Sequence, residues 1–431
     1  MRQTLFYLPE QLGPLDLFGV GWLLILWLFI GGLLVLRAIR RSDGKSEAMG
    51  LLPMIGLVAL AIVFLVPRIE QDIPTGFATF PPVAAARGLP IRGYGVMLLF
   101  AVVSAVTLGI YRSQKAGLNP DLIFGLGFTV ILAGIVGARL FFIIQYWNLM
   151  KGATLAETLG NVLSVVNGGL VVYGSLIGAA IGFLYFTYKH KLHPLALADL
   201  IAPSLALGLA IGRLGCLLNG CCFGGPCQHD MAWSVTFPAE SPPYVYQQSL
   251  GYLHGIRIRA DQNDRVLVSE LDLESPVVKV DLAVGEQIVE VNGYSVQDLP
   301  HAQALLERSG PRLEVRLAGG RQVSWTIEQL PERSLPVHPT QLYSSLNAFL
   351  LFFLTLAYFP FRNRHGQVIA LLLSLYAVTR FLLEWVRTDE NAFMAQMTIS
   401  QNVSVAITIG MIVLWGFVLR QPRFAMIHRV D

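Results

Sequence analysis

Long apolar stretches separated by short polar loops run through the chain from near its first residue to its last. A helix needs roughly 20 apolar residues to cross a bilayer, and nine stretches approach that length. They are Phe18–Leu36, Met49–Val66, Tyr94–Ile110, Leu122–Tyr146, Leu170–Tyr188, Leu195–Leu218, Leu342–Phe359, Val368–Trp385 and Val403–Leu419. The pattern predicts an all-α polytopic membrane protein with about nine transmembrane helices.

The composition supports this interpretation. Of the 431 residues, 54% are hydrophobic and 14% are charged, whereas soluble domains carry about 25% charged residues. An ordinary soluble protein is excluded, and we expect no nucleic-acid partner. Residues Met1 to Phe18 lack a basic start that leads directly into an apolar run, so no cleavable signal peptide is expected.

The distribution of basic residues predicts the orientation. Thirteen lie in the loops after the first, third, fifth and seventh spans and in the tail, and five lie in the other short loops. Basic residues are enriched in cytoplasmic loops. The N-terminus is therefore expected outside and the C-terminus in the cytoplasm, which places the long segment between the sixth and seventh spans outside.

That segment has about 120 residues, too many for an ordinary connection. It alternates four short strand-like runs with one amphipathic helix, Leu299–Ser309; the runs are Arg265–Val268, Gln287–Val291, Leu313–Leu317 and Val323–Ile327. The Asn292-Gly293 pair after an alternating strand predicts a hairpin. Ser275–Val278 and Val284–Gly293 resemble the bacterial PDZ domain. The prediction is a small extracytoplasmic PDZ-like α/β insertion, residues 265–330, after a connecting segment, residues 231–264. PDZ domains bind extended peptides; the alternative is a spacer without a ligand.

Polar residues from six spans are predicted to lie at the outer membrane boundary. They include Tyr94, Arg139, Tyr173, Arg213, Asn219, His338, Gln341, Tyr343, Arg380, Glu384 and Arg387. Each alone is typical of an interfacial anchor or a packing ion pair, but arginine within a membrane is costly and often functional. Several arginines at one depth indicate an oxyanion ligand, of which a phospholipid headgroup is the obvious example.

The sixth span ends in an unusual stretch, Gly212–Gly224, with an arginine, an asparagine, four glycines and three of the four cysteines. Glycines permit close approach of another helix or of a ligand. A snorkelling arginine followed by a tight turn is the plainer alternative. The remaining cysteine, Cys227, follows shortly after the stretch.

Seven strings, in this order, make the chain resemble the prolipoprotein diacylglyceryl transferase family. They are Arg92–Met97, Gly134-x-x-Gly137-x-Arg139, Gly168-Gly169 with Tyr173-Gly174, Gly212-Arg213-x-Gly215-x-x-x-Asn219-Gly220, His338–Tyr343, Arg380-Phe381-x-x-Glu384-x-x-Arg387 and Thr398-x-x-Gln401-x-x-Ser404. The resemblance implies a two-part membrane domain, residues 91–230 and 331–431, preceded by an extra hairpin and loop, residues 1–90. It also implies a multi-pass protein of the bacterial inner membrane.

The resemblance further implies a reaction. The family moves the diacylglyceryl group of phosphatidylglycerol to the lipobox cysteine thiol of a prolipoprotein, and glycerol 1-phosphate leaves. On the matching positions, Arg139, Arg213 and Arg380 would hold phosphate, and Glu384 would orient an arginine. Tyr94 and Asn219 would position the headgroup and glycerol; Gly220, Gln341, Tyr343 and Arg387 complete the expected substrate site.

Three departures leave the catalytic base open. Tyr173 stands where the family usually has histidine, Cys216 replaces the asparagine of its GRxGN string, and Cys221-Cys222 follow Asn219-Gly220 where the family has glutamate. Tyrosine has a pKa near 10 and is a poor base, so Tyr173, His338 or no protein base remain as alternatives. A catalytically altered relative that binds lipid or peptide is the second functional hypothesis.

The four cysteines, Cys216, Cys221, Cys222 and Cys227, lie within twelve positions and indicate one local feature. A metal or redox site formed by these cysteines with His229 is a third functional hypothesis. Their spacing matches no common zinc pattern, so the prediction is no metal site and no cofactor. Because the compartment is expected to be oxidising, a disulfide from Cys227 to one of the other three is the prediction.

Overall fold

The computed structural model describes residues 4–9, 11–40, 88–152, 154–163, 169, 171–227, 231–387, 392–394 and 397–423, with scattered positions between 52 and 64. The chain divides into two compact units. The first contains residues 212–347 and 377–408, and the second contains residues 4–211, 348–376 and 409–431.

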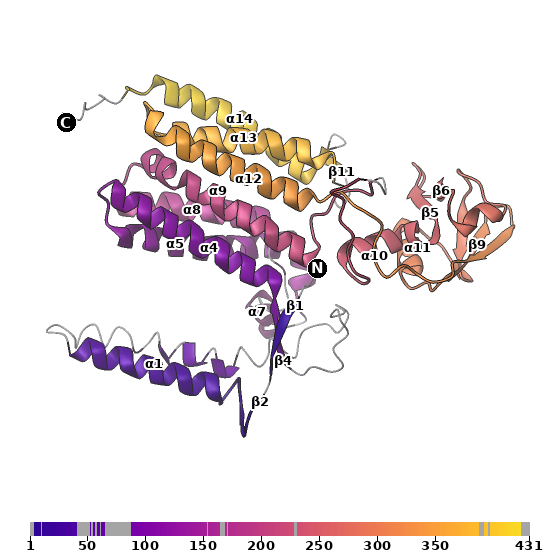
Figure 1. Ribbon diagram of the computed structural model, residues 1–431, viewed down its shortest axis with the longest axis horizontal. Helices are drawn as coiled ribbons and strands as arrows, with labels where there is room; N and C mark the ends of the chain where they lie inside the picture. The colour runs from indigo at the N-terminus through magenta and orange to yellow at the C-terminus, as the bar shows by residue number, and fades with distance from the viewer. Residues whose placement is uncertain are drawn as a thin grey trace. The chain divides into compact units, whose positions relative to one another are not determined.

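Six helices in the described residues are long and apolar enough to cross a membrane. They are α4 (Gly93–Lys115), α5 (Pro120–Gln145), α9 (Pro194–Asn219), α12 (Thr340–Tyr358), α13 (Gln367–Glu384) and α14 (Ile399–Arg420), labelled in Figure 1. They confirm six of the predicted spans. The predicted first and fifth spans are helical as α1 (Trp22–Ile39) and α8 (Val172–Lys189), and the predicted second span, Met49–Val66, lies largely outside the described residues.

In the second unit, α5 and α8 pack closely because glycines line their contact. A Cβ atom on Gly137 would lie 2.4 Å from the carbonyl oxygen of Gly174, and one on Gly178 would lie 2.2 Å from that of Ala133. In a membrane no hydrophobic effect drives helices together, so they associate through close packing, which small residues allow. The glycines of the Gly134-x-x-Gly137 and Tyr173-Gly174 strings therefore serve helix packing.

A buried carboxylate fixes the start of α13 in the same unit. Asp199 of α9 is fully buried and accepts hydrogen bonds from the backbone N–H groups of Gly366 (2.7 Å), Val368 (2.9 Å) and Ile369 (2.9 Å). These N–H groups have no partner within the helix, and a negative charge also suits the positive end of the helix dipole. The pattern of apolar spans gave no sign of this contact.

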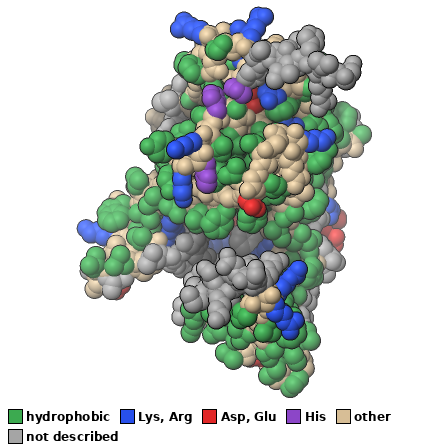
Figure 2. Space-filling model, turned by 90° about the vertical axis from the view of Figure 1, so that its left-hand side faces the viewer, with side chains coloured by type: hydrophobic (Ala, Val, Ile, Leu, Met, Phe, Trp, Pro, Cys, Tyr) green, Lys and Arg blue, Asp and Glu red, His purple; other side chains and the backbone are tan. Residues whose placement is uncertain are grey.

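Two arginines stack on one aromatic ring near Asp199. The guanidinium groups of Arg112 and Arg362 lie 4.2 and 3.5 Å from the ring centre of Phe359. With Lys115 and His193 they line a cavity of about 540 Å³. Figure 2 shows basic and histidine side chains interspersed with apolar ones on the face in view.

Short elements complete the second unit. The strand β1 (Thr4–Pro9) pairs antiparallel with β4 (Gly88–Arg92), directly before α4. The others are β2 (Gln11–Leu12), β3 (Leu15–Asp16), α6 (Trp147–Met150), α7 (Leu155–Leu163) and the 3₁₀ turn η3 (Phe359–Phe361).

Residues 242–326 of the first unit, called the extramembrane part below, mix strands and helices, as predicted. A four-stranded sheet has the order β10-β9-β7-β8, and β5 pairs with β6. The elements are α10 (Pro242–Ser249), η1 (Tyr252–His254), β5 (Ile256–Ala260), β6 (Val266–Leu271), η2 (Pro276–Lys279), β7 (Ile288–Val291), β8 (Tyr294–Ser295), α11 (Leu299–Glu307), β9 (Arg312–Leu317) and β10 (Gln322–Thr326). The four predicted strands and the predicted helix are confirmed.

The Asn-Gly hairpin is also confirmed. Val291 and Tyr294 pair across a two-residue loop in which Asn292 and Gly293 both have positive φ, 52° and 81°. This is the conformation for which Asn-Gly is favoured. The apolar core, however, includes Leu250, Ile256 and Ile258. The predicted boundary at residue 265 falls inside this core, because the apolar alternation of β5 was not recognised as a strand.

Candidate active site

The first unit brings four helix ends around the loop after α9. The loop begins at Gly220, whose φ is +75°. Two side chains from the start of α12 donate hydrogen bonds to its backbone carbonyls. Gln341 donates from Nε2 to the carbonyl oxygen of Cys221 at 2.8 Å, and Thr340 donates from Oγ1 to that of Cys222 at 2.6 Å. Gln341 is fully buried. Two residues of the His338–Tyr343 string thus hold the loop in shape.

Backbone pairing extends this contact. The N–H of Gly224 donates to the carbonyl of His338 at 3.0 Å, and the N–H of His338 donates to that of Gly225 at 3.1 Å. A Cβ atom on Gly224 would lie 2.7 Å from the His338 Cβ, so this position requires glycine. Gly224 also forms a β-bridge with Arg387, beyond the end of α13. The loop is therefore fixed to both α12 and the segment after α13.

Arg380, Glu384 and Arg387 form one charged cluster at the end of α13. Both arginines donate from Nη1 to the same carboxylate oxygen of Glu384, Arg387 at 3.4 Å. The Glu384 side chain is fully buried, and those of Arg380 and Arg387 are 15% and 7% exposed. The cluster keeps a net charge of +1, since two guanidinium groups face one carboxylate. It can therefore attract an anion while each arginine stays oriented.

The start of α14 supports this cluster. Arg380 also donates from Nη2 to Ser400 Oγ at 2.8 Å. Just before, the N–H of Thr398 donates to Gln401 Oε1 (3.0 Å) and the N–H of Gln401 donates to Thr398 Oγ1 (3.2 Å). This reciprocal pair is a capping box, which satisfies N–H groups that a helix start leaves without partners. The Thr398-x-x-Gln401 string thus positions Ser400 against Arg380. The short strands β11 (Ala392–Met394) and β12 (Met397–Thr398) lie before α14.

Three cysteines meet where α9 ends and the loop after it begins. The sulfur atoms of Cys216, Cys221 and Cys222 lie within 4.8 Å of one another. Hydrogen bonds from the thiols of Cys216 and Cys221, followed by the charges of Arg387 and Arg213, lower the pKa of the Cys222 thiol. Arg213, in the last turns of α9, thus acts on the same point as the α13 cluster.

The predicted disulfide is not formed in the structure. All four cysteines are free, and Cys227 does not belong to the group of three sulfurs. Its backbone N–H instead donates to the carbonyl of Pro336 at 2.9 Å. Residues 224–227 pair with residues 336–338 through backbone hydrogen bonds, and this pairing holds Cys227 apart from the three clustered cysteines.

His338 and Tyr343 lie in the same unit as this cluster. The Nδ1 atom of His338 is 3.4 Å from the hydroxyl oxygen of Tyr343. Both side chains are half-buried. Their use as base or substrate contact remains a prediction.

Three predicted site residues belong to the second unit, and their surroundings differ. The guanidinium group of Arg139 donates to the carbonyl oxygens of Asn161 (2.6 Å), Val162 (3.0 Å) and Gly169 (3.2 Å). These bonds tie α5 to the segment before α8. Tyr173, in the first turn of α8, is half-buried, and Tyr94, in the first turn of α4, is exposed. The expected phosphate contact of Arg139 remains untested.

The sequence did not predict Thr340 and Ser400 as part of the site. Thr340 lies inside the quoted His338–Tyr343 string, and Ser400 lies between two quoted positions, Thr398 and Gln401. Their positions in the first turn of two predicted spans could have indicated this role. A threonine or serine in the first turn of a polar-starting span offers a hydroxyl at a helix end, where orphan backbone groups and buried charges need partners.

The fold and site define a multi-pass membrane protein with an arginine-rich, anion-attracting site at converging helix ends. The family model described as prolipoprotein diacylglyceryl transferase matches residues 82–417, so the chain belongs to this family. A Rhodopirellula baltica protein named phosphatidylglycerol–prolipoprotein diacylglyceryl transferase is 30% identical, over 96% of this chain and 88% of the relative. A Clostridium tetani protein of the same name is 27% identical, over 76% and 93%.

Proposed function

We propose that the chain transfers the diacylglyceryl group of phosphatidylglycerol to the lipobox cysteine thiol of prolipoproteins, at the outer face of the bacterial inner membrane. Family membership and the names of the relatives support the reaction. The observation that carries it to particular residues is the buried Arg380–Glu384–Arg387 cluster beside the Cys221–Cys222 loop. The orientation with the N-terminus outside and the C-terminus in the cytoplasm is part of this proposal.

The site residues take roles that follow from their chemistry. Arg380 and Arg387 neutralise the phosphate that leaves as glycerol phosphate, and Glu384 holds both guanidinium groups in place. Preorganised donors aimed at developing charge are worth most where water is excluded. Arg213 adds a further positive charge from α9. Asn219, Gly220, Gln341 and Tyr343 lie in the same unit as these arginines and are proposed to contact the substrate, and Tyr94, Arg139, Tyr173 and His338 complete the predicted set.

The extramembrane part supports a second role in the same proposal. Its sheet and core fit the PDZ-like reading, in which an extended peptide adds a strand to a sheet edge. We propose that it holds an extended part of the secreted preprotein. Deletion of residues 242–330, replaced by a short linker, should spare transfer to a short lipobox peptide and slow transfer to full-length preprotein. Complete loss of peptide transfer would show instead that the segment forms part of the active site.

The test of the transferase reaction is complementation. The chain is expressed in a strain depleted of its own diacylglyceryl transferase, beside its Arg380→Ala variant at equal membrane abundance. Growth restored by the unchanged chain and not by the variant is expected. Failure of the unchanged chain at normal abundance would favour the alternative, a relative that binds lipid or peptide without transfer.

A further inference from the structure

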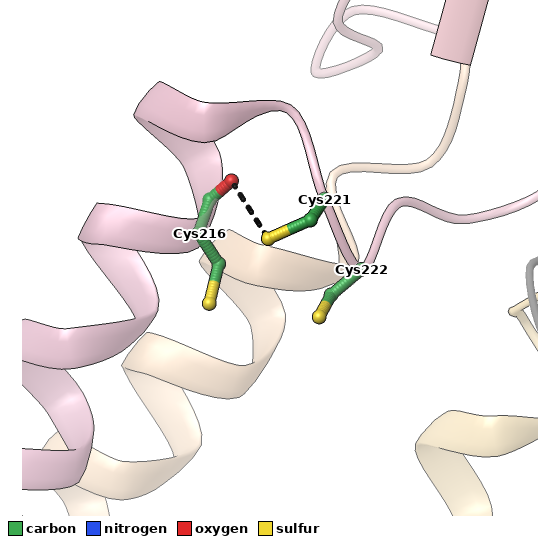
Figure 3. A group of neighbouring side chains, drawn as sticks. All are labelled: Cys216, Cys221 and Cys222. Carbon is green, nitrogen blue, oxygen red and sulfur yellow. Dashed lines mark hydrogen bonds between the residues drawn. The ribbon is translucent and has the colours of Figure 1, made fainter. Parts of the chain in front are cut away.

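Three thiols meet at one point, although the spacing of their cysteines along the sequence matches no common metal-binding pattern. Cys216 stands on α9, and Cys221 and Cys222 follow the turn at Gly220, yet their sulfur atoms all lie within 4.8 Å of one another (Figure 3). All three side chains are half-buried and free. The Cys221 thiol points back to α9 and donates to the carbonyl oxygen of Cys216 at 3.8 Å. Three soft donors thus share one half-buried site.

The backbone at this point is held in a costly shape. Cys222 has a φ of +59°, in the left-handed region that a non-glycine residue occupies at a cost of about 1–3 kcal/mol. The carbonyls on both sides are fixed by Thr340 and the fully buried Gln341. Such strain persists where surrounding contacts impose it, which is common at functional sites. Glycine would relieve the strain, but it would remove the third thiol.

We propose that Cys216, Cys221 and Cys222 bind one zinc ion and leave its fourth position open for the thiol of the prolipoprotein cysteine. This rests on the proposed transferase function. Zinc bound by thiolates at 2.3 Å in a tetrahedron has sulfur atoms roughly 3.8 Å apart. The three sulfurs need to close by only about 1 Å, within the reach of side-chain rotation. Three protein ligands with one open position are the arrangement of catalytic zinc.

The charges around the site suit this occupant. Zinc with three thiolates carries a net charge of −1, and Gly224, two residues after Cys222, forms a β-bridge with Arg387, whose side chain is 7% exposed. Through this bridge, Arg387 would hold the phospholipid phosphate near the metal-bound thiol. Nucleophile and leaving group would then be placed in neighbouring positions.

The ion would also activate the thiol without a protein base. Tyr173 is a poor base for a thiol, whereas a thiol that coordinates zinc is deprotonated outright. The proton passes to solvent when the thiol binds. The thiolate sulfur then forms a bond to the carbon of the diacylglyceryl group that is joined to the phosphate oxygen. The carbon–oxygen bond breaks, its electron pair stays on the phosphate oxygen, and glycerol phosphate leaves next to the arginines.

The first experiment measures metal. The full-length protein is purified in detergent under reducing, chelator-free conditions, and its metal content is determined by mass spectrometry. About one zinc per chain is expected, with loss in Cys216→Ser and Cys222→Ser. Cys227→Ser is the matched control and should keep its zinc, since Cys227 lies outside the cluster. Absence of zinc, copper in its place, zinc retained in Cys222→Ser, or a disulfide between two of the three cysteines would overturn the proposal.

The second experiment tests the open position. Cobalt replaces zinc, and its absorption is recorded as a lipobox peptide is added. A new sulfur-to-cobalt charge-transfer contribution is expected with the cysteine peptide and not with its serine counterpart. Removal of zinc should lower turnover by about 10²–10⁴-fold, the usual contribution of assisted proton removal. Full turnover without zinc would overturn the zinc proposal and leave the transferase reaction intact; failed complementation would reject the reaction itself.

Discussion

Glu384 and Arg380 offer the sharpest test of the arginine cluster. The Glu384 carboxylate is fully buried between Arg380 and Arg387. In Glu384→Gln two guanidinium groups remain without their shared negative partner, and breaking a buried ion pair in this way costs about 3–5 kcal/mol. We expect a lower thermal unfolding temperature in detergent. We also expect loss of turnover, since neither arginine is then oriented.

A double-mutant cycle separates the roles of the pair. Arg380→Ala removes a donor from the leaving phosphate and should lower kcat by about 10²–10³-fold. If Glu384 acts by holding Arg380 and Arg387, the variant with both substitutions should be no slower than the worse single variant. The assay is transfer from phosphatidylglycerol to a lipobox peptide, at equal amounts of folded protein.

An exposed pair in the same unit provides the control. Arg316 and Glu290 lie 3.0 Å apart, with side chains 45% and 26% exposed, and such pairs contribute about 0–1 kcal/mol. Arg316→Ala should leave turnover and unfolding temperature nearly unchanged. Independent, multiplying losses from Arg380→Ala and Glu384→Gln, or full turnover of Arg380→Ala, would refute the reasoning.

Three further predictions follow from the contacts. Gly137→Ala should lower the unfolding temperature, because its Cβ would lie 2.4 Å from a backbone oxygen, whereas Gly416→Ala, with open space around it, should not; wild-type stability of Gly137→Ala would contradict the packing. Asp199→Ala should cost roughly 3–5 kcal/mol by removing the carboxylate that accepts from the start of α13 and pairs with Arg362, and unfolding in denaturant that matches the unchanged chain would argue against this. Residues 242–330 expressed alone should give a cooperative unfolding transition, and residues 265–330 should not; the reverse would misplace the core.

The apolar periodicity predicted the helices well because length and hydropathy alone decide whether a segment can cross a bilayer. It also predicted the β7–β8 hairpin, since Asn292-Gly293 is a local signal. It could not predict the contact of Asp199 with the start of α13, because a carboxylate in one span and N–H groups 167 residues later carry no shared pattern.

The site was predictable in part for the same reason. Arg380 and Glu384 are one turn apart on α13, so spacing alone brings them together, and Arg387 follows shortly after the helix end. The cysteine cluster depends instead on the positive φ of Cys222 and on its carbonyl contact with Thr340. Neither is visible in the spacing of the cysteines, so the sequence did not predict that Cys216, Cys221 and Cys222 would meet.

The central claim is the transfer reaction itself, and one measurement addresses it directly. Purified protein is incubated with phosphatidylglycerol labelled in its acyl chains and a peptide that carries a lipobox cysteine, and the peptide is then weighed by mass spectrometry. The account predicts a peptide heavier by one diacylglyceryl group, attached through a thioether, with glycerol phosphate released in equal amount. A peptide that stays unmodified while the folded protein binds phosphatidylglycerol would contradict it.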